Sequence, residues 1–89
     1  MDGKGWTKIW SVYILRCRDG SLYTGIAKDV QTRVKQHNLG KGGAYTRSRL
    51  PVELVYREDG MTHSEALVRE AKIKRLSRVK KEQVIHGKK

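Results

Sequence analysis

The segment that most constrains the fold is an apolar run near the start of the chain, IWSVYILRC, at residues 9–17. Its β-branched and aromatic residues predict a strand. Both alternating faces of that strand are apolar, with Ile9, Tyr13 and Leu15 on one and Trp10, Val12 and Ile14 on the other. A strand of this kind is buried on both faces, so we expect it to be the central strand of a covered sheet.

Turn and capping signals divide the remaining chain into five further elements. Asp19-Gly20 predicts a hairpin turn, Asp29 fits a helix N-cap, and Thr62 to Glu65 has the spacing of a capping box. The expected elements are a strand at 22–26, a helix at 29–38, a strand at 52–57, a helix at 62–76 and a helix at 78–85 capped by Ser77. Residues 40–51, GKGGAYTRSRLP, have the composition of a loop.

The order β-β-α-β-α-α predicts an α+β fold, a three-stranded antiparallel sheet flanked by helices. With 89 residues the chain has room for one domain. We expect that domain at residues 9–86, between a flexible leader at 1–8 and a flexible tail at 87–89. The oligomeric state is left open.

Composition argues against several classes of protein. Cys17 is the only cysteine, so no intramolecular disulfide can form. Neither a signal peptide nor an apolar run of about 20 residues is visible, and we expect a cytoplasmic protein with no membrane partner. Cys17, His37, His63 and His86 lack the close pairwise spacing of a zinc site.

The net charge indicates the kind of partner. Twenty Lys and Arg against nine Asp and Glu give a formal charge of +11. Such an excess is costly in self-repulsion, and neutralising phosphates releases counterions and favours binding. Nucleic acid is therefore the expected partner, and an ordinary solvated surface is the alternative.

One carboxylate occupies a position that the helical pattern reserves for apolar side chains. On the helix at 62–76, the residues Ala66, Leu67, Ala71 and Ile73 are expected to form the inner face, and Glu70 lies within that arc. A carboxylate buried alone costs several kcal/mol, so Glu70 needs a cation. The pattern alone leaves two choices evenly weighted, a metal ion or a salt bridge to a neighbouring Lys or Arg.

The helix at 29–38 repeats this anomaly. Arg33 and His37 lie one turn apart, in the same arc as the apolar Val30 and Val34. They fit a site for a phosphate, or alternatively an Arg at the margin of the apolar stripe with a hydrogen-bonded His.

The paired strands add two tyrosines and a glycine. Tyr13 and Tyr23 are ordinary strand residues, and each taken singly is better explained by packing. Gly25 is different, because a glycine within a strand indicates the close approach of backbone or ligand.

Together these residues resemble the GIY-YIG nuclease signature. Val12-Tyr13-Ile14 and Tyr23-Thr24-Gly25 are similar to its two halves, and Arg33, His37 and Glu70 follow at matching separations. The similarity extends from about residue 10 to residue 85 and looks closest to the small stand-alone bacterial members. Ser11-Val12 replaces Gly-Ile, and Thr24 replaces Ile. Ile26 stands where some relatives carry a Lys, whose role is either absent here or supplied by Lys28.

The resemblance implies a metal-dependent nuclease that hydrolyses phosphodiester bonds in DNA, in repair or processing. It implies one Mg²⁺ or Mn²⁺ ion bound by Glu70, with Arg33 stabilising charge on the phosphate. Tyr13 or Tyr23 would position or deprotonate the attacking water, and which of them does so is left open. His37 would act as a proton relay or a phosphate contact.

Further residues are expected to bind the nucleic acid: Gly25, Lys28, Lys41, Tyr45, Arg47, Arg49 and Lys74. Tyr45 could stack on an exposed base, and the alternative for its loop is ordinary solubilising charge.

Two other functions are compatible with the sequence of the whole chain. One is a non-catalytic nucleic-acid-binding accessory of repair or of RNA. The other is a structural protein with a buried Arg33–Glu70 pair. Targeting by a protein partner is also possible.

Overall fold

The computed structural model describes residues 8–87 of the 89-residue chain. The expected leader at 1–8 and tail at 87–89 lie outside the described residues, apart from Lys8 and Gly87. The Lys8 ammonium is 3.5 Å from the carboxylate of Glu65. No helix within residues 8–87 is long and apolar enough to cross a membrane.

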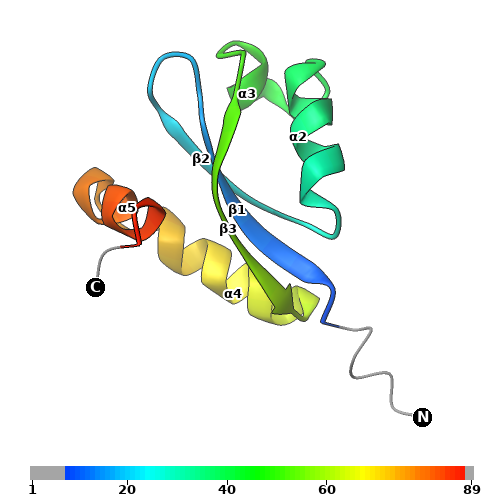
Figure 1. Ribbon diagram of the computed structural model, residues 1–89, viewed down its shortest axis with the longest axis vertical. Helices are drawn as coiled ribbons and strands as arrows, with labels where there is room; N and C mark the ends of the chain where they lie inside the picture. Colours follow the sequence, from blue (N-terminus) through cyan, green and yellow to red (C-terminus); the bar gives the residue numbers. More distant parts are fainter. Residues whose placement is uncertain (1–7, 88–89) are drawn as a thin grey trace.

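The sheet has three antiparallel strands in the order β2-β1-β3, as the sequence predicts (Figure 1). The central strand β1 is Trp10–Arg16, β2 is Leu22–Ala27 and β3 is Glu53–Met61. Strand β3 extends four residues beyond the predicted end at Arg57. The pairing of β3 with β1 shifts register at two places, as at a β-bulge. An irregularity of this kind interrupts the alternation of apolar and polar residues, so the alternation does not mark the end of the strand.

Both faces of β1 are buried, and each face builds its own core. Tyr13 and Leu15 pack with Val30 of helix α2, Val30–Asn38. Val12 and Ile14 pack on the opposite face with Ile73 of helix α4, His63–Lys74. Figure 1 shows α2 and α4 on opposite sides of the sheet, so the prediction of a strand covered on both faces is confirmed.

The helix caps follow the predicted signals. Asp29 accepts a hydrogen bond from the Thr32 amide at 3.1 Å, and Thr62 and Glu65 form both bonds of the capping box. Helix α5, Arg78–Ile85, begins after Ser77 as expected.

The segment predicted as a loop contains one short helix, α3, Ala44–Arg47. Four residues are too few to give a periodic pattern, so composition alone could not predict this turn of helix.

The inner face of α4 differs from the prediction. Ala66 and Ile73 are fully buried, but Leu67 is 43% exposed and Ala71 is also exposed. The buried stripe is centred on Ala66 and Ile73, which places Glu70, rather than Leu67 or Ala71, between them. Apolar character alone misjudged the rotation of this helix, because a helix on one face of a small sheet buries only a narrow stripe.

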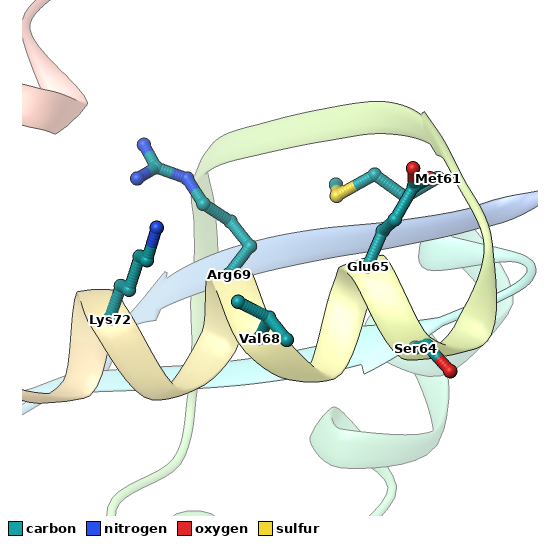
Figure 2. A pocket seen from close by; sticks show the side chains of 6 residues that line it. All are labelled: Met61, Ser64, Glu65, Val68, Arg69 and Lys72. Atoms are coloured by element: carbon teal, nitrogen blue, oxygen red, sulfur yellow. The ribbon is translucent and has the colours of Figure 1, made fainter.

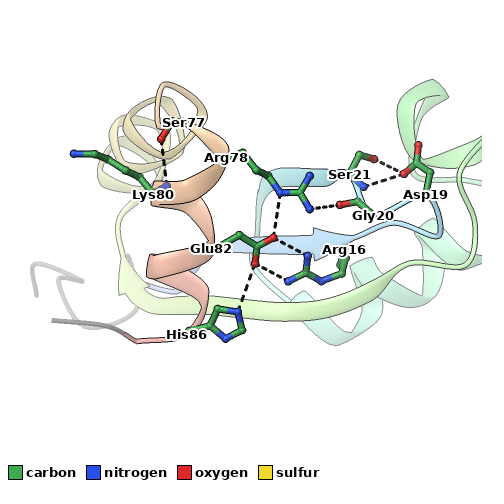
Figure 3. A network of polar contacts seen from close by, with 9 residues as sticks. All are labelled: Arg16, Asp19, Gly20, Ser21, Ser77, Arg78, Lys80, Glu82 and His86. Atoms are coloured by element: carbon green, nitrogen blue, oxygen red, sulfur yellow. Dashed lines mark hydrogen bonds and ion pairs between the residues drawn. The ribbon is translucent and has the colours of Figure 1, made fainter.

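Helix α5 is attached to the end of the sheet by charges around one carboxylate (Figure 3). Glu82 accepts two hydrogen bonds from the Arg16 guanidinium, at 2.8 and 2.9 Å, and one from Arg78 at 3.1 Å. Arg78 also donates to the Gly20 carbonyl in the β1–β2 turn, at 2.7 Å. The hydrogen bond from Arg16, followed by that from Arg78, lowers the pKa of Glu82 to about 2.

We predict that this carboxylate makes the docking of α5 sensitive to acid. A lowered pKa means that Glu82 stabilises the fold above the unfolded-state value of about 4.3, and that this contribution is lost as the pH falls toward 2. Glu82→Gln should lower the melting temperature at pH 7 and flatten its dependence on pH between 4 and 2. Thermal unfolding followed by circular dichroism measures both effects.

The matched control is Glu53→Gln, which removes the same charge from an exposed position on β3 beside Arg16, where the carboxylate acts on the guanidinium by charge and the described contacts include no hydrogen bond between them. It should leave the acid dependence unchanged. Equal effects of the two substitutions would show that overall charge, rather than the Arg16–Glu82 contact, is responsible.

Candidate active site

The predicted catalytic residues gather around the β2 edge of the sheet. Tyr13 on β1 is paired with Gly25 on β2, and its ring lies against the glycine backbone. A Cβ at Gly25 would be 2.6 Å from the Tyr13 hydroxyl oxygen and would collide with it. The missing side chain therefore allows the phenol to cross β2, which explains in physical terms why a glycine interrupts this strand.

The Tyr13 hydroxyl is held by the imidazole of His37, on α2. The phenol oxygen is 3.0 Å from Nε2, and the other ring nitrogen, Nδ1, is 2.8 Å from the Thr46 hydroxyl on α3. His37 is fully buried. Both ring nitrogens are engaged and the ring is inaccessible, so neither nitrogen of His37 is open to a phosphate in this conformation.

Burial acts on both partners of this contact. Burial, then the neighbouring Tyr23, raises the pKa of the Tyr13 phenol to about 12. Burial, then the Arg33 guanidinium, lowers the pKa of His37. Both shifts favour the neutral forms near pH 7, so the phenol keeps its proton and the imidazole keeps one free lone pair.

Arg33 and Glu70 approach the same phenol from two different helices. The Arg33 guanidinium opposes the rise in the pKa of Tyr13, and the Glu70 carboxylate adds to that rise. Both charges are thus close enough to act on the hydroxyl, although α2 and α4 lie on opposite faces of the sheet. The β2 edge is where groups from the two faces can meet.

Glu70 has an ion pair with Lys74, which is the salt bridge weighed as an alternative. The ammonium is 3.3 Å from the carboxylate, one helical turn away. The Lys74 side chain is 55% exposed and that of Glu70 is 19% exposed. An exposed i,i+4 pair contributes only about 0.3–0.5 kcal/mol, so this contact does not by itself account for a carboxylate on the buried stripe.

The buried Arg33–Glu70 pair considered above does not form within residues 8–87. The Arg33 side chain donates instead to the Gln36 amide oxygen, at 3.1 Å. The guanidinium and the carboxylate are thus not neutralised by each other.

Tyr23 and Tyr45 form an aromatic layer beside the site. Their rings stack with centroids 6.0 Å apart, and Tyr23 meets the edge of His37 at 5.3 Å. Arg49 lies 3.9 Å from the centroid of Tyr45 and is held by Asp19 at 3.1 Å. Tyr45 remains 41% exposed. The predicted loop residues thus belong to a packed surface rather than to a free loop.

The other predicted nucleic-acid contacts are distributed around this edge and its helices. Lys28 is exposed and lies 5.5 Å from the Trp10 ring centroid, Lys41 and Arg47 are exposed, and Lys74 contacts Glu70. Arg49 is the one most engaged in structural contacts, because it also donates to the Tyr45 carbonyl at 2.8 Å.

The oxygen ligand available at this site suits a hard divalent cation that needs few protein ligands. No group of three or more His, Cys, Asp or Glu within residues 8–87 could hold a metal, which leaves Glu70 as a single, partly exposed carboxylate. Mg²⁺ prefers oxygen ligands and keeps several waters, so one carboxylate and a substrate phosphate fit its shell.

A separate hollow of about 490 Å³ lies along α4, away from these residues (Figure 2). It is lined by Met61, Ser64, Glu65, Val68, Arg69 and Lys72. None of the predicted catalytic side chains lines it, so this hollow is distinct from the candidate active site.

Two site residues escaped the sequence analysis, Thr46 and Gly42. A Cβ at Gly42 would be 2.0 Å from Nδ1 of His37, so the backbone of the 40–51 segment packs directly on the imidazole. The pair Gly42-Gly43 is a usable signal of close approach, although the composition of its segment predicts only a loop.

The chain is similar to proteins of one family along most of its length. Residues 9–83 match the model of the GIY-YIG catalytic domain. A UPF0213 protein of Staphylococcus epidermidis is 60% identical over 74 residues, which are 83% of this chain and 90% of the relative. A UPF0213 protein of Staphylococcus aureus is 58% identical over the same shares of the two chains.

Two solved structures share the fold. The solution NMR structure of the UPF0213 protein BH0048 from Bacillus halodurans has a TM-score of 0.56 and 48% identity, over 86% of this chain and 82% of that one. The solution NMR structure of the protein EF2693 from E. faecalis has a TM-score of 0.58 and 39% identity over the same shares.

We predict that ionising Tyr13 destabilises the fold at high pH. Because the folded-state pKa is raised, the stability that the neutral Tyr13 phenol contributes is complete below the unfolded-state pKa of about 10. That stability is lost between pH 10 and 12. A shift of this size corresponds to about 2–3 kcal/mol. Denaturant unfolding at pH 9 to 12 should show this loss in the wild type and not in Tyr13→Phe, with phenolate absorbance following the titration. An equal decline in both proteins would contradict the assignment.

Proposed function

This chain belongs to the GIY-YIG nuclease family, and we infer that it hydrolyses phosphodiester bonds in nucleic acid with one divalent ion held by Glu70. The observation that carries this inference is the convergence at the β2 edge. The Arg33 guanidinium on α2 and the Glu70 carboxylate on α4 both act on the Tyr13 phenol on β1, although packing of the sheet alone requires neither of them to approach it.

Each of these groups has a chemical task in phosphodiester hydrolysis. When bound, Mg²⁺ or Mn²⁺ supplies positive charge to a phosphate oxygen and to the leaving oxygen. Glu70 would hold the ion, after releasing the exposed Lys74. Arg33 would bind the phosphate and stabilise the negative charge that grows on it.

The hydrogen bonds favour Tyr13 over Tyr23 as the residue that handles the proton of the attacking water. Its hydroxyl is 3.0 Å from a ring nitrogen of His37, whereas Tyr23 makes no side-chain hydrogen bond within residues 8–87. Since Tyr13 keeps its own proton near pH 7, it would act as a relay. The water proton would pass to the phenol oxygen as the phenol proton passes to His37. Tyr23 would orient His37 by packing against its ring.

Charge supports a nucleic-acid substrate, for which we propose DNA and a role in repair or processing. The net charge of +11 favours any polyphosphate. The exposed Tyr45, Lys41 and Arg47 extend from the site along the α3 segment, where they would track the backbone and stack on a base. Cytoplasmic location and recruitment by a partner protein remain part of this proposal.

The second candidate is a non-catalytic nucleic-acid-binding protein. The same charge distribution supports it, and so does the ion pair that occupies Glu70. It predicts salt-sensitive binding in a gel-shift assay, with no cleavage of plasmid, branched or single-stranded DNA, or of RNA, in the presence of Mg²⁺ or Mn²⁺.

We predict that Glu70→Gln abolishes metal-dependent cleavage and barely changes stability. Loss of the metal-binding carboxylate should reduce the rate at least about 100-fold, while the lost exposed ion pair costs only about 0.5 kcal/mol. Cleavage of this panel of nucleic acids, with and without EDTA, measures the first effect, and thermal unfolding measures the second.

The matched control is Lys74→Ala, which breaks the same ion pair but leaves the carboxylate in place. It should retain metal-dependent cleavage at saturating substrate, with a higher KM because Lys74 is also an expected nucleic-acid contact, and lose about as much stability as Glu70→Gln. Activity that survives both EDTA and Glu70→Gln would refute the proposed mechanism. Equal loss of activity in the two variants would show that the ion pair itself, rather than a metal-binding carboxylate, is needed.

A further inference from the structure

The α3 segment ends in a buried polar contact that the proposed chemistry does not yet use. Thr46 is 1% exposed, although it lies on a short helix whose other residues are all exposed. Its hydroxyl oxygen is 2.8 Å from Nδ1 of His37 and 3.5 Å from the Gly43 carbonyl oxygen. A buried hydroxyl costs free energy unless it is hydrogen-bonded, and this one has two partners.

One assignment of protons gives every group in this chain of contacts a partner. The Gly43 carbonyl can only accept a hydrogen bond, so in this assignment the Thr46 hydroxyl donates to it. The Thr46 oxygen then accepts from Nδ1–H of His37. A neutral imidazole carries one proton, so Nε2 is left as the acceptor for the Tyr13 hydroxyl, 3.0 Å away.

The backbone packs closely around this arrangement. Gly42 packs on the imidazole so closely that a Cβ would be 2.0 Å from Nδ1. Gly43 has a φ of +123°, a conformation that L side chains rarely adopt. Both glycines therefore let the segment close over His37 and bring Thr46 to the ring.

We propose that Thr46 is a positioning residue that holds His37 in the tautomer protonated at Nδ1, so that Nε2 accepts the proton of Tyr13. The proposal rests on the proposed nuclease function for its catalytic consequence. In the attack step a water O–H bond breaks and an O–H bond forms on Tyr13. The original Tyr13 O–H bond breaks as an N–H bond forms at Nε2, and the hydroxide oxygen bonds to phosphorus. Without Thr46 the proton could reside on Nε2, and Tyr13 would have no acceptor.

The test is a direct measurement of the tautomer in the full chain labelled with ¹⁵N. Long-range proton–nitrogen correlation spectra at neutral pH distinguish the protonated nitrogen from the bare one, and His37→Gln assigns the signals. The wild type should carry the proton on Nδ1 of His37. A proton found on Nε2 would overturn the proposal without any variant, even if Thr46→Val failed to fold.

Two variants then connect the tautomer with the chemistry. Thr46→Val keeps the shape but removes the acceptor, so it should shift His37 toward the tautomer protonated at Nε2. It should also lower kcat about 10-fold or more while leaving KM within about 2-fold, because substrate binding does not involve this hydroxyl. Thr46→Ser restores the hydroxyl and should restore both the tautomer and kcat.

The outcomes separate this inference from the function on which it rests. Unchanged tautomer and kcat in Thr46→Val would refute the positioning role while leaving the nuclease intact. A wild type with the expected tautomer but no cleavage of any substrate would instead refute the nuclease proposal, and with it the catalytic consequence, and would leave only a structural role for Thr46.

Discussion

Burial of β1 on both faces is the constraint on which the rest of this structure depends. Val12 and Ile14 require a cover on one face, and Tyr13 and Leu15 require one on the other. In so short a chain, one helix with its neighbours has to supply each cover, so α2 and α4 end on opposite sides of the sheet. Their functional side chains can then meet only around an edge strand, and β2 is the edge where they do.

Close approach between backbone and side chain shapes the site at that edge. Gly25 lets the Tyr13 ring lie over β2, and Gly42 lets the α3 segment lie against His37. Each glycine lacks the Cβ that would collide with a reactive group. The geometry of the site therefore depends on the absence of a Cβ at these two glycines as well as on the functional groups. A side chain at either position would displace β2 or the α3 segment.

The basic side chains differ over the surface in whether they are paired with carboxylates. Around Glu82, two guanidinium groups share one carboxylate, and the one from Arg16 on β1 fixes α5 to the sheet. Glu58 receives two hydrogen bonds from Arg69 on the same side of the sheet. The acidic residues are thus largely used for internal contacts, and much of the exposed surface remains basic and suited to phosphate.

The sequence by itself determined the element order, the central strand, the caps at Asp29, Thr62 and Ser77, and the candidates Tyr13, Arg33, His37 and Glu70. The elements and caps depend on local periodicity and on residue types a few positions apart, which a sequence displays directly. The set of candidate residues depends on the resemblance to the family signature. It also predicted a helix face that the structure corrects, since Leu67 and Ala71 are exposed while Ala66 and Ile73 are buried.

Only the tertiary structure decided which distant groups meet. The contact of Thr46 with His37, the ring of Tyr13 over Gly25 and the placement of Glu70 near Tyr13 all join segments from different elements. No local pattern encodes such meetings, because they follow from how two helices are placed on opposite faces of one sheet. The sequence alone could propose the candidate groups, and the packing decided which tyrosine hydroxyl lies within hydrogen-bonding distance of an imidazole nitrogen.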